Sequence, residues 1–250
     1  MPRPNTFLRG ALVVAIAFSV LACSGRPRLI PAPPNPYPGP TPVVLATPLP
    51  NAKYAEALVA ALAADPLALH LVETLKFKGL YELDGVNVNV TTELDLSGRD
   101  MEIHEVSKVT GKAGKTTKLA LVVVGKTVYA RVAGTPWKKV RRSDFEQDIT
   151  DVVRGLQVVR NPRYLSYVGV ETIDKRKLHH LKANRTFTYT TGYATGTYDK
   201  FDVWVKDDGT PVLVKAKISA VGPYGIELAG TTEMRFSKFG GPIKIVAPKN

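Results

Sequence analysis

The feature that most constrains the fold is an alternation of apolar and polar residues with a period of two. It is clearest in GVNVNVTTELDL at 85–96, where one face collects Val86, Val88, Val90, Leu94 and Leu96. Successive side chains of a β-strand point to opposite faces, so this pattern is typical of a strand with one buried face. Similar patterns fill 66–132 and resume at 163. The sequence therefore predicts one long antiparallel sheet.

Turn signals divide this sheet into strands. Gly125-Lys126 and the segment DDGTP at 207–211 stand between alternating runs, which predicts tight hairpins at both places. The run 119–124 is apolar on both faces, so we expect it to be covered on both sides. Two further sets of residues are each expected to share one face: Phe201, Val203 and Val205, and Val212, Val214, Ala216 and Ile218.

Two segments have helical patterns instead. Residues 51–65 begin with Asn51 as a candidate N-cap, and in 141–159 Ser143 and Glu146 have the spacing of a capping box. The second segment carries an apolar stripe formed by Phe145, Ile149, Val152, Val153 and Leu156. A sheet of about eight or more strands curls. We therefore predict an α+β fold, a curved antiparallel half-barrel with helices packed on its concave side.

The N-terminal part of the chain has a different composition. Arg3 and Arg9 precede the uncharged apolar stretch 11–22, which is too short to span a bilayer and is typical of a secretory signal peptide. Residues 25–50 contain ten prolines. Such a segment stays extended, at ~3.1 Å per residue, and would reach up to roughly 80 Å. The predicted divisions are a signal peptide at 1–22, a tether at 23–50 and one domain at 51–250.

Cys23 is the single cysteine of the chain and lies where the apolar stretch meets the proline-rich one. A core thiol is not expected between an export signal and a solvated tract. A reactive thiol would need an activating neighbour, and only Arg26 is close in sequence. Covalent attachment of acyl chains is the remaining interpretation, with Cys23 as the first residue of the exported protein.

Residue patterns for catalysis and metal binding are missing from the sequence. It has no Gly-x-Ser-x-Gly motif and no phosphate-binding glycine loop. His179 and His180 are adjacent, and adjacent residues of a strand point to opposite faces, so they are not expected to share a metal. We predict a protein that is not an enzyme and uses neither cofactor nor metal.

The formal net charge is +12, and cleavage before Cys23 would remove Arg3 and Arg9 and leave +10. Lysines gather in 108–118 and basic residues in WKKVRR at 137–142. We expect the second cluster to contact anionic lipid head groups, through Lys138, Lys139, Arg141 and Arg142. The alternative is charge that only keeps the protein soluble. Nucleic acid is not an expected partner of an exported protein.

Several stretches resemble known families. VLAC at 20–23 resembles the lipobox of bacterial lipoproteins, although Leu21 stands where a smaller residue is usual. The body, over 52–248, resembles the LolA-like lipoproteins, and within them the LppX/LprG family. The resemblance rests on YLSYVGVETIDKRKLHHLKA (164–183), FDVWVKDDGTPVLVKAKI (201–218) and FSKFGGPIKIVAP (236–248). At 174–176 the chain has Asp-Lys-Arg, where that family often has Asn/Asp-Gly.

The resemblance implies a half-open barrel whose concave face holds the acyl chains of lipids. The expected lining is Val86, Val88, Val90, Phe201, Val203, Val205, Ile226, Leu228 and Met234, with Phe145, Ile149, Val152 and Leu156 as a lid or floor. The alternative is that these side chains fill the core and leave no cavity.

Two functions follow as hypotheses. The first is a membrane-anchored lipoprotein that binds and transfers lipid or lipid-linked molecules, outside the cytoplasm, on the cell membrane or on an outer membrane if the host has one. The second is an envelope sensor or adaptor that uses the same fold to bind a protein or polymer. In both we expect a monomer.

Overall fold

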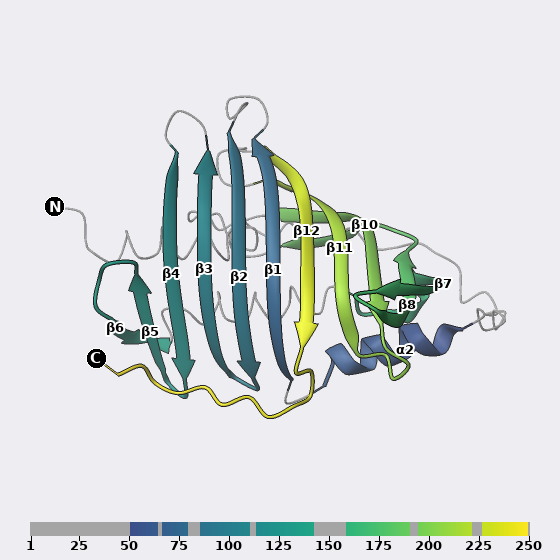
Figure 1. The fold of residues 1–250 in the computed structure, drawn as a ribbon, viewed down its shortest axis with the longest axis horizontal. Helices are drawn as coiled ribbons and strands as arrows, with labels where there is room; N and C mark the ends of the chain where they lie inside the picture. Colours follow the sequence, from purple (N-terminus) through teal and green to yellow (C-terminus); the bar gives the residue numbers. More distant parts are fainter. Residues whose placement is uncertain are drawn as a thin grey trace, which may run out of the picture.

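The computed structural model describes residues 51–64, 67–79, 86–110, 114–142, 159–190, 195–221 and 227–249. In this part of the chain one sheet of twelve strands carries the fold (Figure 1). The elements in chain order are α2 (Ala52–Leu62), β1 (Ala68–Gly79), β2 (Asn87–Ser97), β3 (Asp100–Thr110), β4 (Lys115–Val124), β5 (Thr127–Val132), β6 (Lys138–Arg141), η3 (Pro162–Tyr164), β7 (Leu165–Ile173), β8 (Arg176–Ala183), β9 (Phe187–Thr190), β10 (Thr195–Val205), β11 (Pro211–Val221) and β12 (Glu227–Ser237).

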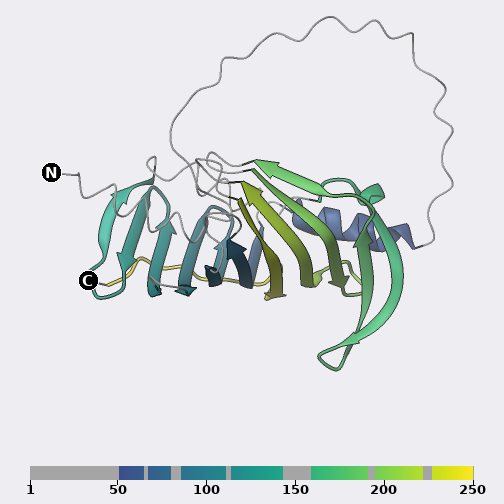
Figure 2. The same ribbon diagram turned by 90° about the horizontal axis from the view of Figure 1, so that it is seen from above.

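The sheet consists of two antiparallel halves joined in the middle. The strand order is β6-β5-β4-β3-β2-β1-β12-β11-β10-β8-β7, and β9 pairs with β10. Strands β1 to β6 pair with their neighbours in sequence, and β1 then pairs antiparallel with β12 at the far end of the chain. Seen from above, the sheet is open and curls most strongly at the end formed by β10, β8 and β7 (Figure 2). The predicted fold class is therefore confirmed.

Helix α2 lies inside the curled end of the sheet and packs against η3, β7 and β8 (Figure 2). Its buried residues are Ala55, Leu58 and Leu62, which have the spacing of one helical face. Asn51 precedes the helix, as expected, but it has a left-handed backbone and its side chain makes no cap hydrogen bond. The prediction of Asn51 as a side-chain cap was therefore wrong.

Within the described residues, no helix is long and apolar enough to cross a membrane. The second predicted helix falls almost entirely on 143–158, which lies outside the described residues together with its apolar stripe. Its role as a lid or floor stays a prediction.

The predicted hairpins are present. Gly125 and Lys126 form the turn between β4 and β5, and the amide of Lys206 donates to the carbonyl of Thr210 at 3.0 Å between β10 and β11. The run 119–124 is covered on both faces, since Leu119 through Val123 are buried. Val212 departs from its predicted face. A register shift between β10 and β11 turns it away from Val214, and it packs against Leu178, Trp204 and Leu213 on the other side of the sheet.

The turn between β7 and β8 explains the departure noted at 174–176. Asp174 and Lys175 both have positive φ values, of 49° and 64°, in a turn that usually favours Asn-Gly. Arg235 on β12 binds the carboxylate of Asp174 at 2.6 Å. This ion pair holds the Asp-Lys turn against the outer side of the sheet.

Gly209 in the β10–β11 turn allows α2 to approach the sheet. A Cβ atom there would lie 2.3 Å from the Cβ of Ala57 on the helix. Its φ of +80° also belongs to the left-handed region, which residues with a side chain rarely adopt. The turn and the helix are therefore fitted to each other at a residue without a side chain.

We expect Gly209→Ala to destabilise the domain more than Gly134→Ala. Gly134 has a similar φ of +78° and no atom within 4 Å of the added Cβ, so Gly134→Ala would introduce backbone strain without a steric clash. The clash with α2 should add about 1–3 kcal/mol to the loss of unfolding free energy. Equal losses in urea denaturation would show that the contact between Gly209 and Ala57 does not limit packing.

Candidate functional site

The candidate site is the inner face of the sheet, which we define as the face on the side of α2. Alternate residues of nearly every strand contribute apolar side chains to it, and most of these are buried. Those from β1 to β4 are Leu71, Leu75, Phe77, Val90, Leu94, Leu96, Met101, Ile103, Leu119, Leu121 and Val123, and those from β10 to β12 are Tyr198, Phe201, Val203, Val205, Val214, Ala216, Ile218 and Met234. The inner face is thus largely apolar across both halves of the sheet.

Most of the predicted lining residues that the structure describes lie on this face. Val90, Phe201, Val203, Val205 and Met234 are buried in it. Val88 packs against the same cluster, and Val86 precedes β2 and is half-buried. Ile226 and the side chain of Leu228 lie outside the described residues, as does Cys23. Whether any of these residues contacts a lipid stays a prediction.

A small apolar pocket lies between α2 and the strands. It is lined by Leu58, Leu62, Val159, Tyr198, Phe201, Val203, Pro211, Val214, Met234 and Phe236. Its volume is about 20 Å³, which is the room of about one water molecule. Three of the predicted lining residues, Phe201, Val203 and Met234, line this pocket. The pocket is too small in this structure to hold an acyl chain.

Aromatic stacking fixes α2 over the inner face. The ring of Tyr54 on the helix stacks on His179 of β8 with 3.6 Å between centroids. Tyr167 donates a hydrogen bond to Nδ1 of His179 at 3.2 Å, and Nε2 then donates to Asp207 at 2.7 Å. His179 therefore links the helix to the β10–β11 turn.

A row of polar side chains interrupts the apolar inner face. Glu73 of β1 lies directly opposite Thr92 of β2, and Thr92 lies opposite Glu105 of β3. The row continues in Leu119 of β4 on one side and Met234 of β12 on the other. Two carboxyl groups therefore stand on either side of one threonine within apolar surroundings.

Few hydrogen bonds compensate for the burial of the polar side chains in this row. The hydroxyl of Thr232 donates to Oε1 of Glu73 at 2.9 Å. Three buried side-chain atoms have no hydrogen-bond partner: Oγ1 of Thr92, Oε2 of Glu105 and Oγ of Ser107. Glu105 is 3 % exposed and Ser107 is 1 % exposed, and both stand on the same face of β3 two residues apart. Buried polar atoms are nearly always paired in proteins, so this group is unusual.

The surroundings raise the pKa of both carboxyl groups. Burial raises the pKa of Glu73 to about 7, against a smaller opposing effect of its hydrogen bond from Thr232. Burial also raises the pKa of Glu105 to about 8, and the negative charge of Glu73 adds to this effect. Below these values each group is a neutral acid that can donate as well as accept.

Sequence reasoning missed this row, although the sequence contains a signal for it. In LHLVETLKF at 69–77, Glu73 occupies an inward position between Leu71 and Leu75. In MEIHEVSKV at 101–109, Glu105 and Ser107 occupy inward positions after Ile103. Acidic residues in the apolar register of two strands that flank a third would have indicated a shared buried site.

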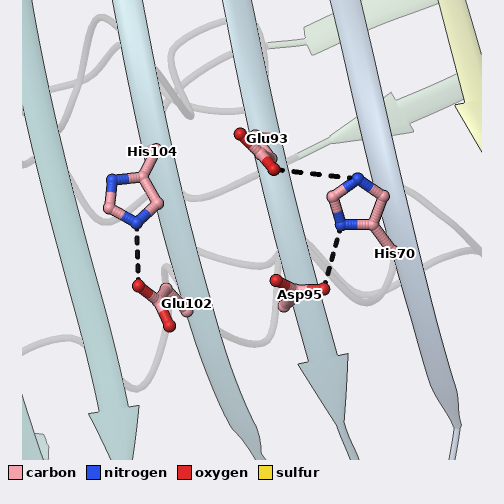
Figure 3. Close-up of polar contacts among 5 residues, drawn as sticks. All are labelled: His70, Glu93, Asp95, Glu102 and His104. Carbon is pink, nitrogen blue, oxygen red and sulfur yellow. Dashed lines mark hydrogen bonds and ion pairs between the residues drawn. The ribbon is translucent and has the colours of Figure 1, made fainter. Parts of the chain in front are cut away.

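The outer face is polar and carries separate histidine contacts. Figure 3 shows His70 beside Asp95, at 2.9 Å, and Glu93, at 3.8 Å, and His104 beside Glu102, at 2.8 Å. Among the described residues, no group of three or more histidine, cysteine or acidic side chains is arranged to hold a metal ion. The contacts of His70 join β1 to β2, whereas the contact between His104 and Glu102 lies within β3.

The two adjacent histidines point to opposite faces, as expected. Whereas His179 faces α2, His180 lies between Glu171 at 2.8 Å and Asp202 at 2.9 Å and stacks on Trp204. Trp204 donates to the other oxygen of Glu171 at 2.9 Å. These hydrogen bonds lower the pKa of Glu171 below its usual range.

The four predicted basic contact residues do not share one face. In the edge strand β6, Lys138 pairs with Ala130 and lies on the inner face, whereas Lys139 pairs with Tyr129 and Arg141 with Thr127 on the outer face. Arg142 donates to the carbonyl of Gly125 at 2.7 Å. Contact with anionic head groups stays a prediction, and it would involve Lys139 and Arg141 together.

Comparisons with known proteins find similarity at the level of solved structures. No protein-family model matches the sequence, and no curated protein matches it. A LolA superfamily protein from Nitrosomonas europaea is 10% identical, with a TM-score of 0.30 over 77% of this chain and 93% of that one. A beta-barrel-like protein with a domain of unknown function from Brucella abortus is 7% identical, with a TM-score of 0.27 over 70% and 99%.

The buried carboxyl groups predict that stability falls as pH rises. A carboxyl group with a raised pKa keeps its proton in the folded state at pH values where the unfolded group has already ionised. The free energy of unfolding therefore falls from about pH 4.5, where the unfolded group ionises, up to about pH 8. We expect Glu105→Gln to remove much of this slope, measured as the urea midpoint at pH 6 and pH 9. Glu102→Gln, on the outer face of the same strand, should leave it unchanged. An unaltered slope in Glu105→Gln would contradict the assignment.

Proposed function

We propose that this protein is a membrane-anchored lipoprotein, working outside the cytoplasm, that binds lipid or acylated molecules on the inner face of its sheet and transfers them. The observation that carries the proposal is the largely apolar inner face of an open, curved sheet. Acyl chains gain roughly 25 cal/mol for each Å² that they bury, without needing specific polar partners. The proposal includes no catalytic step, cofactor or metal.

The small pocket sets a requirement for binding. Because it holds only about 20 Å³, a bound acyl chain must displace side chains or shift α2. The helix packs against η3, β7 and β8 at one end of the sheet, so its movement would leave most strand pairs intact. Binding would therefore open space between Leu58 and Leu62 of α2 and the strands below.

The anchor and location are supported by the sequence alone. Arg3, Arg9 and the apolar stretch 11–22 form an export signal, and Cys23 follows at the position of a lipobox cysteine. The prolines of 25–50 would act as a tether that lets the domain work away from the membrane. We place the protein on the extracytoplasmic side of the cell membrane, or of an outer membrane if the host has one.

The first test is lipid binding by detergent-free protein with Cys23→Ala. We expect lipid in its organic extract by mass spectrometry, and displacement of a fluorescent apolar probe by added lipid. Val203→Phe fills the pocket and should weaken probe binding several-fold, whereas Val170→Phe changes a side chain that is 54 % exposed on β7 and should not. Protein without lipid that also fails to bind the probe would refute the proposal and favour an adaptor.

The second test addresses the anchor. Replacement of Cys23 by Ala removes the acylated side chain, so we expect the protein to move from the membrane to the soluble fraction of its host. The domain should keep the thermal midpoint of the anchored protein, since Cys23 lies outside the sheet and helix described above. Retention of the Cys23→Ala protein in the membrane would exclude this anchor.

The adaptor hypothesis has one specific observation in its favour. An open groove of about 470 Å³ is lined by residues that include Thr74, Lys76, Lys200, Lys215 and Glu233. A charged groove of this kind suits a polar polymer or protein segment. Capture of such a partner by the lipid-free protein, combined with a failed probe assay, would support the adaptor.

A further inference from the structure

The polar row of the inner face has the properties of a ligand subsite. Its acidic members come from β1 and β3, and the residues on either side along these strands are Leu71, Leu75 and Ile103. Ser107 follows Glu105 on the same face of β3 and is also buried without a hydrogen-bond partner. A serine buried without a partner two residues from Glu105 gives a second, independent reason to expect a bound group.

We propose that Glu73, Thr92, Glu105 and Ser107 bind the primary ammonium group of an amphiphile whose hydrocarbon chain lies on the apolar inner face. This inference rests on the proposed lipid binding and specifies the class of ligand. The four residues lie on three adjacent strands, with Thr92 directly opposite both Glu73 and Glu105. A single small group can therefore contact all three strands.

The number of free acceptors favours an ammonium group. Oγ1 of Thr92, Oε2 of Glu105 and Oγ of Ser107 can each accept a hydrogen bond and have no partner. A primary ammonium group can donate to all three atoms, whereas an alcohol donates one hydrogen bond. An ionised carboxylate could accept only from the two hydroxyls and would leave Oε2 of an ionised Glu105 unpaired. Leaving a buried polar atom unpaired costs about 1–3 kcal/mol, so a ligand that satisfies all three regains this energy.

The charge of the subsite also favours an ammonium group. An anionic head group would bring a further negative charge beside Glu73 and Glu105. The inner-face residues of the neighbouring rows are Leu71, Leu94, Ile103 and Leu121 on one side, and Leu75, Val90, Ser107 and Thr117 on the other. None of these described residues is a cation, so a ligand ammonium is the group that would balance the carboxylates.

The experiment compares three ligands with the same chain of twelve carbons: dodecylamine, dodecanol and dodecanoate. Each displaces a fluorescent apolar probe from the full chain carrying Cys23→Ala, at pH 8 and below micellar concentrations. We expect dodecylamine to bind at least about tenfold more tightly than dodecanol, since hydrogen bonds to charged groups contribute about 1.5–3 kcal/mol. Dodecanoate should bind most weakly. The net positive charge of the protein opposes nonspecific binding of an amine.

Variants distinguish the contribution of the polar subsite to binding from that of the apolar surface. Glu105→Gln keeps the shape of the side chain and Ser107→Ala removes a single hydroxyl, and each should reduce the affinity for dodecylamine more than the affinity for dodecanol. Glu102→Gln is the matched control, because Glu102 lies on the outer face of the same strand beside His104. Urea denaturation of each variant establishes that it is folded.

The outcomes distinguish the two proposals. Binding of dodecanol and dodecylamine with equal affinity, preference for dodecanoate, or an unchanged amine preference in Glu105→Gln and Ser107→Ala would overturn the ammonium subsite alone. Failure of all three ligands to bind would overturn the proposed lipid binding and the subsite with it.

Discussion

The pairing of β1 with β12 is the contact on which the rest of the structure depends. It joins His70 to Ser237 at one end and Gly79 to Leu228 at the other, through ten antiparallel residue pairs. The strands on either side are connected mostly to their neighbours in sequence, so each half of the sheet is a local structure. Without this long-range pairing the two halves would share no continuous inner face.

The same pairing determines the chemistry of the inner face. It places the hydroxyl of Thr232, from β12, on the carboxyl group of Glu73, from β1, and so gives that acid its hydrogen bond. On the other side, the pairing of β2 with β3 places Glu105 beside Thr92 without supplying a partner for either free atom. Under the proposed function, the apolar surface would bind a hydrocarbon chain, and the polar row would determine which end group that chain carries.

Periodicity in the sequence predicted the sheet, its hairpins and the inward residues, because alternation is a direct consequence of strand geometry. It failed where the register changes or a capping contact depends on tertiary structure. Val212 changes face at a register shift, and Asn51 adopts a backbone that its sequence position did not indicate. The significance of Glu73 and Glu105 appears only when three strands, β1, β2 and β3, are aligned side by side.

The two edges of the sheet are unlike each other, and both discourage further strands. Strand β6 is four residues long, and three of these residues are basic. Strand β7 has a register shift between Tyr167 and Gly169. Short, charged or irregular edges resist pairing with another chain. Lys138, Lys139 and Arg141 would therefore keep the open sheet from pairing edge to edge with another copy of the chain and growing into aggregates.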